Sequence, residues 1–129
     1  MAEIGIEVHV RKSANLAEWV SHVSNWDFDM TMDMVFNMGD PVIGVHRTYL
    51  SENIRQGVMW SNTQNYSNAR VDELLEQATV ELNKDKRKAL YSEFQQIVTE
   101  ELPVLWINVV SFHTVYNTGL RNLPVSIWV

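Results

Sequence analysis

The chain has 129 residues, enough for one domain or for one piece of a larger domain. Ten basic and sixteen acidic residues give a formal net charge of −6, which argues against a nucleic-acid or anionic-membrane surface, because such surfaces need a basic patch. The absence of cysteine excludes disulfides, thiol catalysis and thiolate metal sites.

The sequence also contains no signal for the membrane. No apolar run approaches the roughly 20 residues of a membrane span. The first residues, MAEIGIEV, have neither the basic nor the apolar region of a signal peptide. If the natural protein is exported, we expect its signal to lie outside this chain.

The first expected element is a strand that begins almost at the first residue. Apolar side chains occupy alternate positions from Ile4 to Val10, and Glu7, His9 and Arg11 alternate with them. This period of two predicts a strand with one apolar face. A core strand without a lead-in suggests a chain cut from something longer.

A short helix is expected next. Leu16, Trp19, Val20 and Val23 recur at the i, i+3, i+4 and i+7 spacing of an amphipathic helix. Residues 13–15 are suited to cap its start, and Asn25 to close it.

The longest regular pattern covers residues 26–36. Every even position is apolar, and Asp27, Asp29 and Asp33 fall at odd positions, which predicts a strand with one buried and one acidic face. The GDP turn at 39–41 ends it, because proline removes a ladder donor. The strand–helix–strand unit predicts two parallel neighbours with a right-handed crossover. Residues 37–67 show no strong periodicity, so we expect a functional loop or short helices there.

Two helical stripes follow and predict an αα-hairpin. Asn68 and Asp85 are the expected N-caps. The stripes consist of Val71, Leu74, Leu75, Ala78 and Leu82, and of Leu90, Phe94, Ile97 and Val98.

The end of the chain is expected to return to strands. Short strands are predicted at residues 104–107 and 111–116, and the tail at 123–129 is apolar to its last residue. Residues 1–129 are therefore expected to form a single α/β domain or a fragment of one. Its order is a strand–helix–strand unit, an αα-hairpin and short C-terminal strands.

Residues that could carry chemistry have simpler structural explanations. The three aspartates of the second strand would spread over roughly 20 Å at about 3.3 Å per residue, so a solvated face is favoured over a metal site. No histidine pair has metal-ligand spacing, and no hydrolase or nucleotide-binding motif is present. We therefore predict no enzyme activity, no catalytic residue, no metal site and no cofactor.

The methionines of the second strand suggest a copper site, since thioethers are soft ligands. Met30, Met32 and Met34 alternate on the face expected to be buried, which favours core packing. Met38 lies past the regular part. A methionine near a pocket provides an adaptable apolar surface for varied ligands.

Five sequence motifs, taken in their order along the chain, indicate a protein family. The set resembles the C-terminal part of the family 5 solute-binding proteins of bacterial ABC importers, which bind dipeptides, oligopeptides, nickel chelates and sugars. The match extends from Ile4 to about Leu123. The motifs are WDFDM at 26–30, GDP at 39–41, YSNARVDELL at 66–75, KRKALY at 86–91 and ELPVLW at 101–106.

The resemblance implies a piece of a two-lobed protein that closes over a solute and delivers it to a membrane permease. The chain would hold part of a type II-like periplasmic binding-protein lobe, without the first lobe. The implied localisation is periplasmic or extracytoplasmic. Met34, Phe36, Asn37 and Met38 would form one wall of the ligand cleft, where backbone groups and Asn37 orient the ligand and apolar side chains contact it.

Peptide-binding relatives commonly hold the free amine of the peptide with an aspartate in this segment. The corresponding position here is the uncharged Asn37, which forgoes the charge-assisted part of that bond. Either Asp33 or Asp40 holds the amine, or the ligand has none. For Asp40, a turn-forming role before Pro41 is the favoured alternative.

Three alternatives stay open. The solute could be a metal chelate or a sugar in place of a peptide. The chain could be a self-associating interaction domain, a homodimer through the surface that the missing lobe leaves uncovered. An enzyme has only scattered carboxylates and histidines in its favour.

Overall fold

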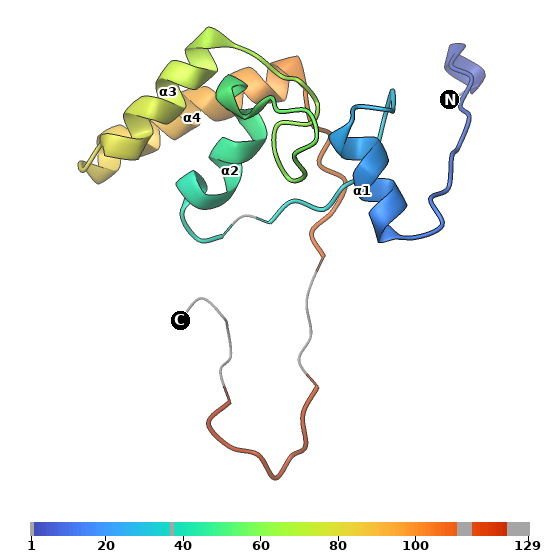
Figure 1. The fold of residues 1–129 in the computed structure, drawn as a ribbon. Helices are drawn as coiled ribbons and strands as arrows, with labels where there is room; N and C mark the ends of the chain where they lie inside the picture. Colours follow the sequence, from blue (N-terminus) through green and yellow to red (C-terminus); the bar gives the residue numbers. More distant parts are fainter. Residues whose placement is uncertain (1, 37, 111–114, 124–129) are drawn as a thin grey trace.

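The structure of this chain is a computed structural model that describes residues 2–36, 38–110 and 115–123. All regular secondary structure in these residues is helical, and none of them lies in a strand (Figure 1). The predicted α/β class is therefore wrong for this part of the chain. The helices are η1 (Ala2–Ile4), α1 (Leu16–Ser24), α2 (Pro41–Tyr49), η2 (Ser51–Asn53), α3 (Ala69–Val80) and α4 (Lys84–Glu101).

The predicted short helix is confirmed as α1, and its capping is local. The Asn15 side chain accepts a hydrogen bond from the backbone N–H of Glu18 at 3.0 Å, and the Glu18 carboxylate accepts from the N–H of Ala14 at 2.6 Å. Asn25 is the C-cap, as predicted. Val23 is buried but Leu16 is 66% exposed, so only part of the apolar stripe is covered.

The αα-hairpin is also confirmed, with two corrections. Asn68 caps α3 through bonds from the N–H groups of Arg70 and Val71, but α4 is capped by Asn83 and not by Asp85, which lies in its first turn. Helix α3 ends at Val80, so Leu82 falls outside the stripe and is 96% exposed. At the other end of α4, Leu102 takes a left-handed conformation (φ 50°) before Pro103.

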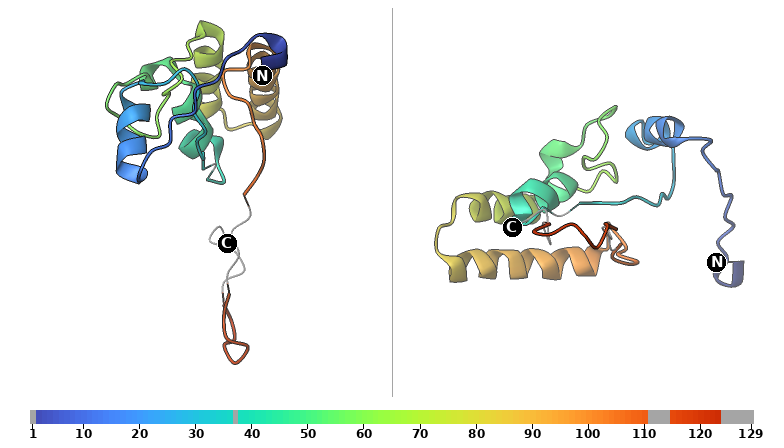
Figure 2. Two further views of the ribbon diagram at one scale, coloured as in Figure 1. Left: turned by 90° about the vertical axis from the view of Figure 1, so that its right-hand side faces the viewer. Right: turned by 90° about the horizontal axis from the view of Figure 1, so that it is seen from below.

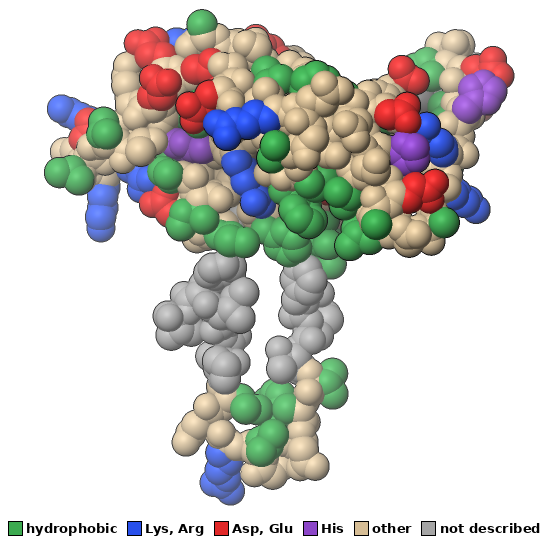
Figure 3. All heavy atoms as spheres, in the orientation of Figure 1, with side chains coloured by type: hydrophobic (Ala, Val, Ile, Leu, Met, Phe, Trp, Pro, Cys, Tyr) green, Lys and Arg blue, Asp and Glu red, His purple; other side chains and the backbone are tan. Residues whose placement is uncertain are grey.

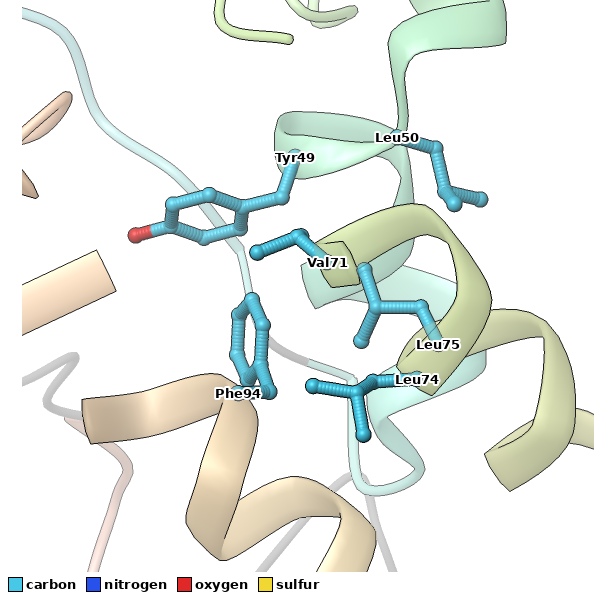
Figure 4. Packing of buried hydrophobic residues seen from close by; sticks show 6 residues of the cluster. All are labelled: Tyr49, Leu50, Val71, Leu74, Leu75 and Phe94. Carbon is cyan, nitrogen blue, oxygen red and sulfur yellow. The ribbon is translucent and has the colours of Figure 1, made fainter. Parts of the chain in front are cut away.

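The hydrophobic core lies where α2 packs against this hairpin (Figure 4). The Tyr49 ring meets Phe94 edge to face with centroids 5.1 Å apart, and meets Tyr66 in the same way at 6.1 Å. Burying each aliphatic member contributes about 1.5–3 kcal/mol. The buried cluster consists of Tyr49, Leu50, Val71, Leu74, Leu75 and Phe94.

Asn62, which is fully buried, organises the irregular connection after α2. Its amide nitrogen donates to the carbonyl groups of Leu50 at 3.0 Å and Tyr66 at 2.7 Å, and its amide oxygen accepts from the N–H of Tyr66 at 3.0 Å. One side chain thus bonds three backbone groups of this irregular connection. Part of the expected loop at 37–67 is therefore an ordered support for the core.

The predicted strands at 4–11, 26–36 and 104–107 are the main correction. These segments run without helix or strand structure, apart from the start of the first, which lies in η1. The N-terminal arm lies away from the packed helices, and the chain after α4 extends outward and turns back (Figures 1 and 2). Arg11 joins the first two segments by donating to the Asp27 carboxylate at 3.0 Å.

Most apolar side chains of these segments remain exposed, although Trp26, Phe28 and Val35 are half-buried and Val104 packs against the core. A strand needs a neighbour that bonds its backbone and covers its apolar face, and the described residues supply none. The strand predicted at 111–116 falls mainly on residues outside the described part, but Val115 and Tyr116 are exposed and irregular; the tail from residue 124 is also outside. Exposed members include Ile4, Ile6, Val8, Val10, Met30, Met32, Met34, Phe36, Leu105, Trp106, Ile107, Val109 and Val110.

Candidate functional site

The predicted cleft wall lies in the irregular connection that leads into α2. Met34 is 45% exposed and Phe36 38% exposed, while Met38 is half-buried. Asn37 lies outside the described residues. The wall residues are therefore neighbours along one connection, and Asp40 fixes its end.

Asp40 caps α2 and forms an ion pair with Arg87. Its Oδ1 accepts from the N–H of Val42 at 3.0 Å, in a helix that starts with Pro41. The Arg87 guanidinium donates to both carboxylate oxygens at 2.8–3.0 Å. These bonds, first those from Arg87 and then that from Val42, hold the pKa of the Asp40 carboxyl below its usual range. Both oxygens are engaged within the chain, so a structural role accounts for Asp40 without a ligand.

Arg87 links three helices at this point. Besides Asp40 at the start of α2, its Nε donates to the carbonyl oxygen of Ala78 near the end of α3, at 2.9 Å. Its guanidinium carbon lies 5.5 Å from the ring centroid of Tyr91, one turn further along α4, a cation–π distance. Its ability to bond three partners at once comes from the planar fork of the guanidinium.

His46 is buried beside this ion pair, with 4% of its surface exposed. Its Nε2 lies 2.9 Å from the Tyr91 hydroxyl, and its Nδ1 lies 3.5 Å from the Thr79 hydroxyl. Thr79 donates its own proton to the carbonyl oxygen of Leu75 at 2.9 Å, so it can only accept from His46. On these contacts we assign the ring proton to Nδ1, with Nε2 as the acceptor from Tyr91.

The surroundings favour this neutral imidazole. Burial lowers the pKa of His46, the nearby Asp40 carboxylate opposes that effect, and the Arg87 guanidinium adds to it. We call Asp40, His46, Thr79, Arg87 and Tyr91 the polar cluster. It connects α2 to both helices of the hairpin.

Asp33, the other candidate for holding an amine, sits in a different environment. Its carboxylate accepts from the backbone N–H of Met34 at 2.6 Å. Loss of solvation raises the pKa of this carboxyl, and the Met34 bond and the Arg47 charge oppose the rise. The buried Nε of Arg47 has no hydrogen-bond partner among the described residues.

Other site types find no support among the residues that the structure describes. They contain no group of three or more His, Asp or Glu side chains placed to hold a metal ion. None of their helices has the length and apolar character needed to cross a membrane. An open hollow of about 670 Å³ lies between the end of α3 and the first half of α4, and none of the predicted site residues lines it.

Hydrophobic side chains are concentrated on one side of the molecule. In Figure 3 they gather along the lower edge of the packed body, and acidic and basic side chains are scattered over its upper part and both sides. Exposed apolar surface of this kind commonly marks an interaction or ligand site.

Comparison of the chain with protein-family models, with curated proteins and with solved structures finds no match in any of the three.

Sequence reasoning missed helix α2 and most of the polar cluster. The signal for the start of α2 was present, because an aspartate followed by proline is typical of an N-cap and first helical residue. The partner of Asp40 carried no such signal. Arg87 lies 47 residues further along the chain, on another helix.

Proposed function

We propose that the chain acts as the C-terminal part of a solute-binding protein of a bacterial ABC importer. It binds a peptide or a similar small solute without chemical change and takes part in delivering it to a membrane permease. This role places the protein in the periplasm or another extracytoplasmic space. Met34, Phe36, Asn37 and Met38 contribute one wall of the cleft.

The ordered set of motifs supports the family assignment. In the structure residues 66–75 lead into α3 and include the fully buried Val71, Leu74 and Leu75, residues 86–91 lie in the first part of α4, and residues 101–106 lie at its end and in the exposed segment beyond it. The GDP motif supplies the cap of α2. These residue types at these positions serve capping and packing, and they hold the cleft-wall segment in place.

The observation that carries the function is the exposed wall itself. Met34 and Phe36 are partly exposed, at 45% and 38%, on a connection whose end is fixed by the Asp40–Arg87 pair. Ligand pockets are lined mainly by apolar and aromatic side chains held by a rigid support. Because Asp40 is fully engaged, the described wall offers a solute apolar contact without a free aspartate at its fixed end.

Native mass spectrometry of the purified chain tests this function. The chain is measured alone at two concentrations, and then with a pool of synthetic tripeptides and with the same pool acetylated at the N-terminus. We expect a monomer that carries an adduct, with no preference for the free amine. Phe36→Ala should reduce the adduct several-fold, whereas Val80→Ala, at an exposed apolar position on α3, should leave it unchanged.

The outcome also decides between the alternatives. A chain that purifies without an adduct and binds neither pool would overturn the proposal. A concentration-dependent dimer without adduct would favour the self-associating domain, which has the exposed apolar side chains of the three irregular segments in its favour. A preference for unacetylated peptides would show that another group holds the amine.

A further inference from the structure

The polar cluster is the second connection between α2 and the hairpin, apart from the apolar core. The core secures the C-terminal end of α2 through Tyr49. The cluster secures its beginning and middle, through Asp40 and His46. Since the cleft-wall segment enters α2 at Asp40, the cluster also determines where that segment ends.

The cluster is built around an uncharged imidazole. The Tyr91 hydroxyl donates to Nε2 only while that nitrogen is unprotonated. A proton on Nε2 would point at the Tyr91 proton, so the Tyr91 hydroxyl would have to change from donor to acceptor. Nδ1 would keep its proton toward Thr79. The hydrogen bond that joins α2 to α4 would therefore have to be remade.

The charged groups around His46 do not compensate for its burial. From α4, the Arg87 guanidinium repels an imidazolium, and the Tyr91 hydroxyl adds no charge. From α3, the facing group is Thr79, which does not titrate. From the start of α2 itself, Asp40 attracts the imidazolium, but its carboxylate is paired with Arg87.

We propose that acidification loosens α2 from the α3–α4 hairpin through protonation of His46, and with it the Asp40 cap at the start of α2. The polar cluster is then a pH-sensitive latch. Its consequence for the solute, weaker binding at acid pH, rests on the proposed function. The latch itself does not.

The direction follows from linkage. The folded-state pKa of His46 is lowered from its ordinary value of 6.5, chiefly by burial. The latch is therefore complete above pH 6.5 and is lost as the pH falls below 6.5 and through the folded-state pKa. The pKa of the Asp40 carboxyl is lowered from 3.8. Asp40 therefore titrates in a more acid range than His46.

Hydrogen exchange of the intact chain tests the latch without any ligand. Exchange of the α2 amides is compared at pH 7.5 and 5.5 after correction for intrinsic chemistry. In the native chain we expect the opening equilibrium of α2 to rise at pH 5.5, because His46 binds a proton more readily in the open state than in the folded state. His46→Gln, which keeps a polar group near the Nε2 position but does not titrate, should abolish the rise.

His9→Gln is the matched control, because His9 is an exposed histidine on the N-terminal arm. It should keep the full response of the native chain. A native chain whose α2 exchange is independent of pH would overturn the latch, and so would a response that survives in His46→Gln.

If the His46→Gln chain fails to fold, a second measurement on the native chain tests the proposal. The ring protons of His46 in the native chain are followed by NMR between pH 4.5 and 8. We expect them to titrate below 6.5, together with the change in α2 exchange. Titration at or above 6.5 would overturn the proposal. Both readouts are separate from tripeptide binding, so the latch and the proposed function fail independently.

Discussion

Two regions of this chain are rich in apolar residues and differ in how much of that surface they bury. The body formed by α2, α3 and α4 buries Val71, Leu74 and Leu75 completely, whereas the segments at 4–11, 26–36 and 104–110 leave most of their apolar side chains exposed. A helix satisfies its own backbone and has only one face to cover. A period-two segment needs a neighbour for both its backbone and its apolar face. The helices of the body cover one another's apolar faces. Among the described residues, no neighbouring strand pairs with the extended segments.

The largest effect is expected in the body. Leu74→Ala removes a fully buried side chain between α2 and the hairpin, so the free energy of unfolding should fall by about 2–5 kcal/mol. Urea unfolding followed by far-UV circular dichroism measures it. Leu105→Ala, at a position 68% exposed in the extended region, should change it by about 0.5 kcal/mol or less. Equal losses would abolish the distinction between the two regions.

Asn62→Ala should give the next largest loss. It leaves the carbonyl groups of Leu50 and Tyr66 and one N–H without their side-chain partner in a buried place, which should cost about 2–3 kcal/mol. The same urea unfolding experiment reads it out. Asn108→Ala, an exposed amide in the extended region, is the control, and a loss no larger than the control's would contradict the role assigned to Asn62.

The Asp40–Arg87 pair should contribute less, because both side chains are partly exposed. Asp40→Asn keeps the helix cap and loses the ion pair, so it should destabilise less than Asp40→Ala, which loses both. A double-mutant cycle with Arg87→Met isolates the pair. Strictly additive effects would show that the two residues act separately and that the start of α2 is held by the cap alone.

Stability should also fall in mildly acid solution. Because burial lowers the folded-state pKa of His46 from 6.5, its stabilising contribution is full above pH 6.5 and disappears as the pH falls through the folded-state value. Thermal midpoints between pH 7.5 and 5 measure the loss. The midpoint of His46→Gln should vary less over this range than that of the native chain, and an identical profile would contradict the assignment.

The smallest effect is expected from the exposed methionines. Met32 is 79% exposed, so Met32→Ser should change the free energy of unfolding by about 0.5 kcal/mol or less. Met38→Ser, at a half-buried position beside the start of α2, should cost more. A loss of several kcal/mol for Met32→Ser would mean that this segment packs against a surface in solution. The contrast between the two regions would then not hold.

The sequence by itself determined the elements whose signals are local. Helices α1, α3 and α4 combine a 3.6-residue apolar period with an asparagine that bonds the first N–H groups. The sequence pattern did not predict helix α2, because its buried residues include Gly44, His46 and Thr48, which form no apolar stripe. The period-two segments predicted strands, and that prediction is wrong for the described residues, because no neighbouring segment pairs with their backbone.

Only the tertiary structure decided the roles within the candidate site. Of its predicted members, Met34 and Phe36 are exposed on the connection, and Asp40 is engaged by a residue of another helix. No local pattern relates Asp40 to Arg87, or His46 to Tyr91, because these pairs lie 47 and 45 residues apart. A helix cap and a helical stripe are encoded by neighbours in sequence, but a hydrogen-bonded cluster exists only once α2 is packed on the hairpin.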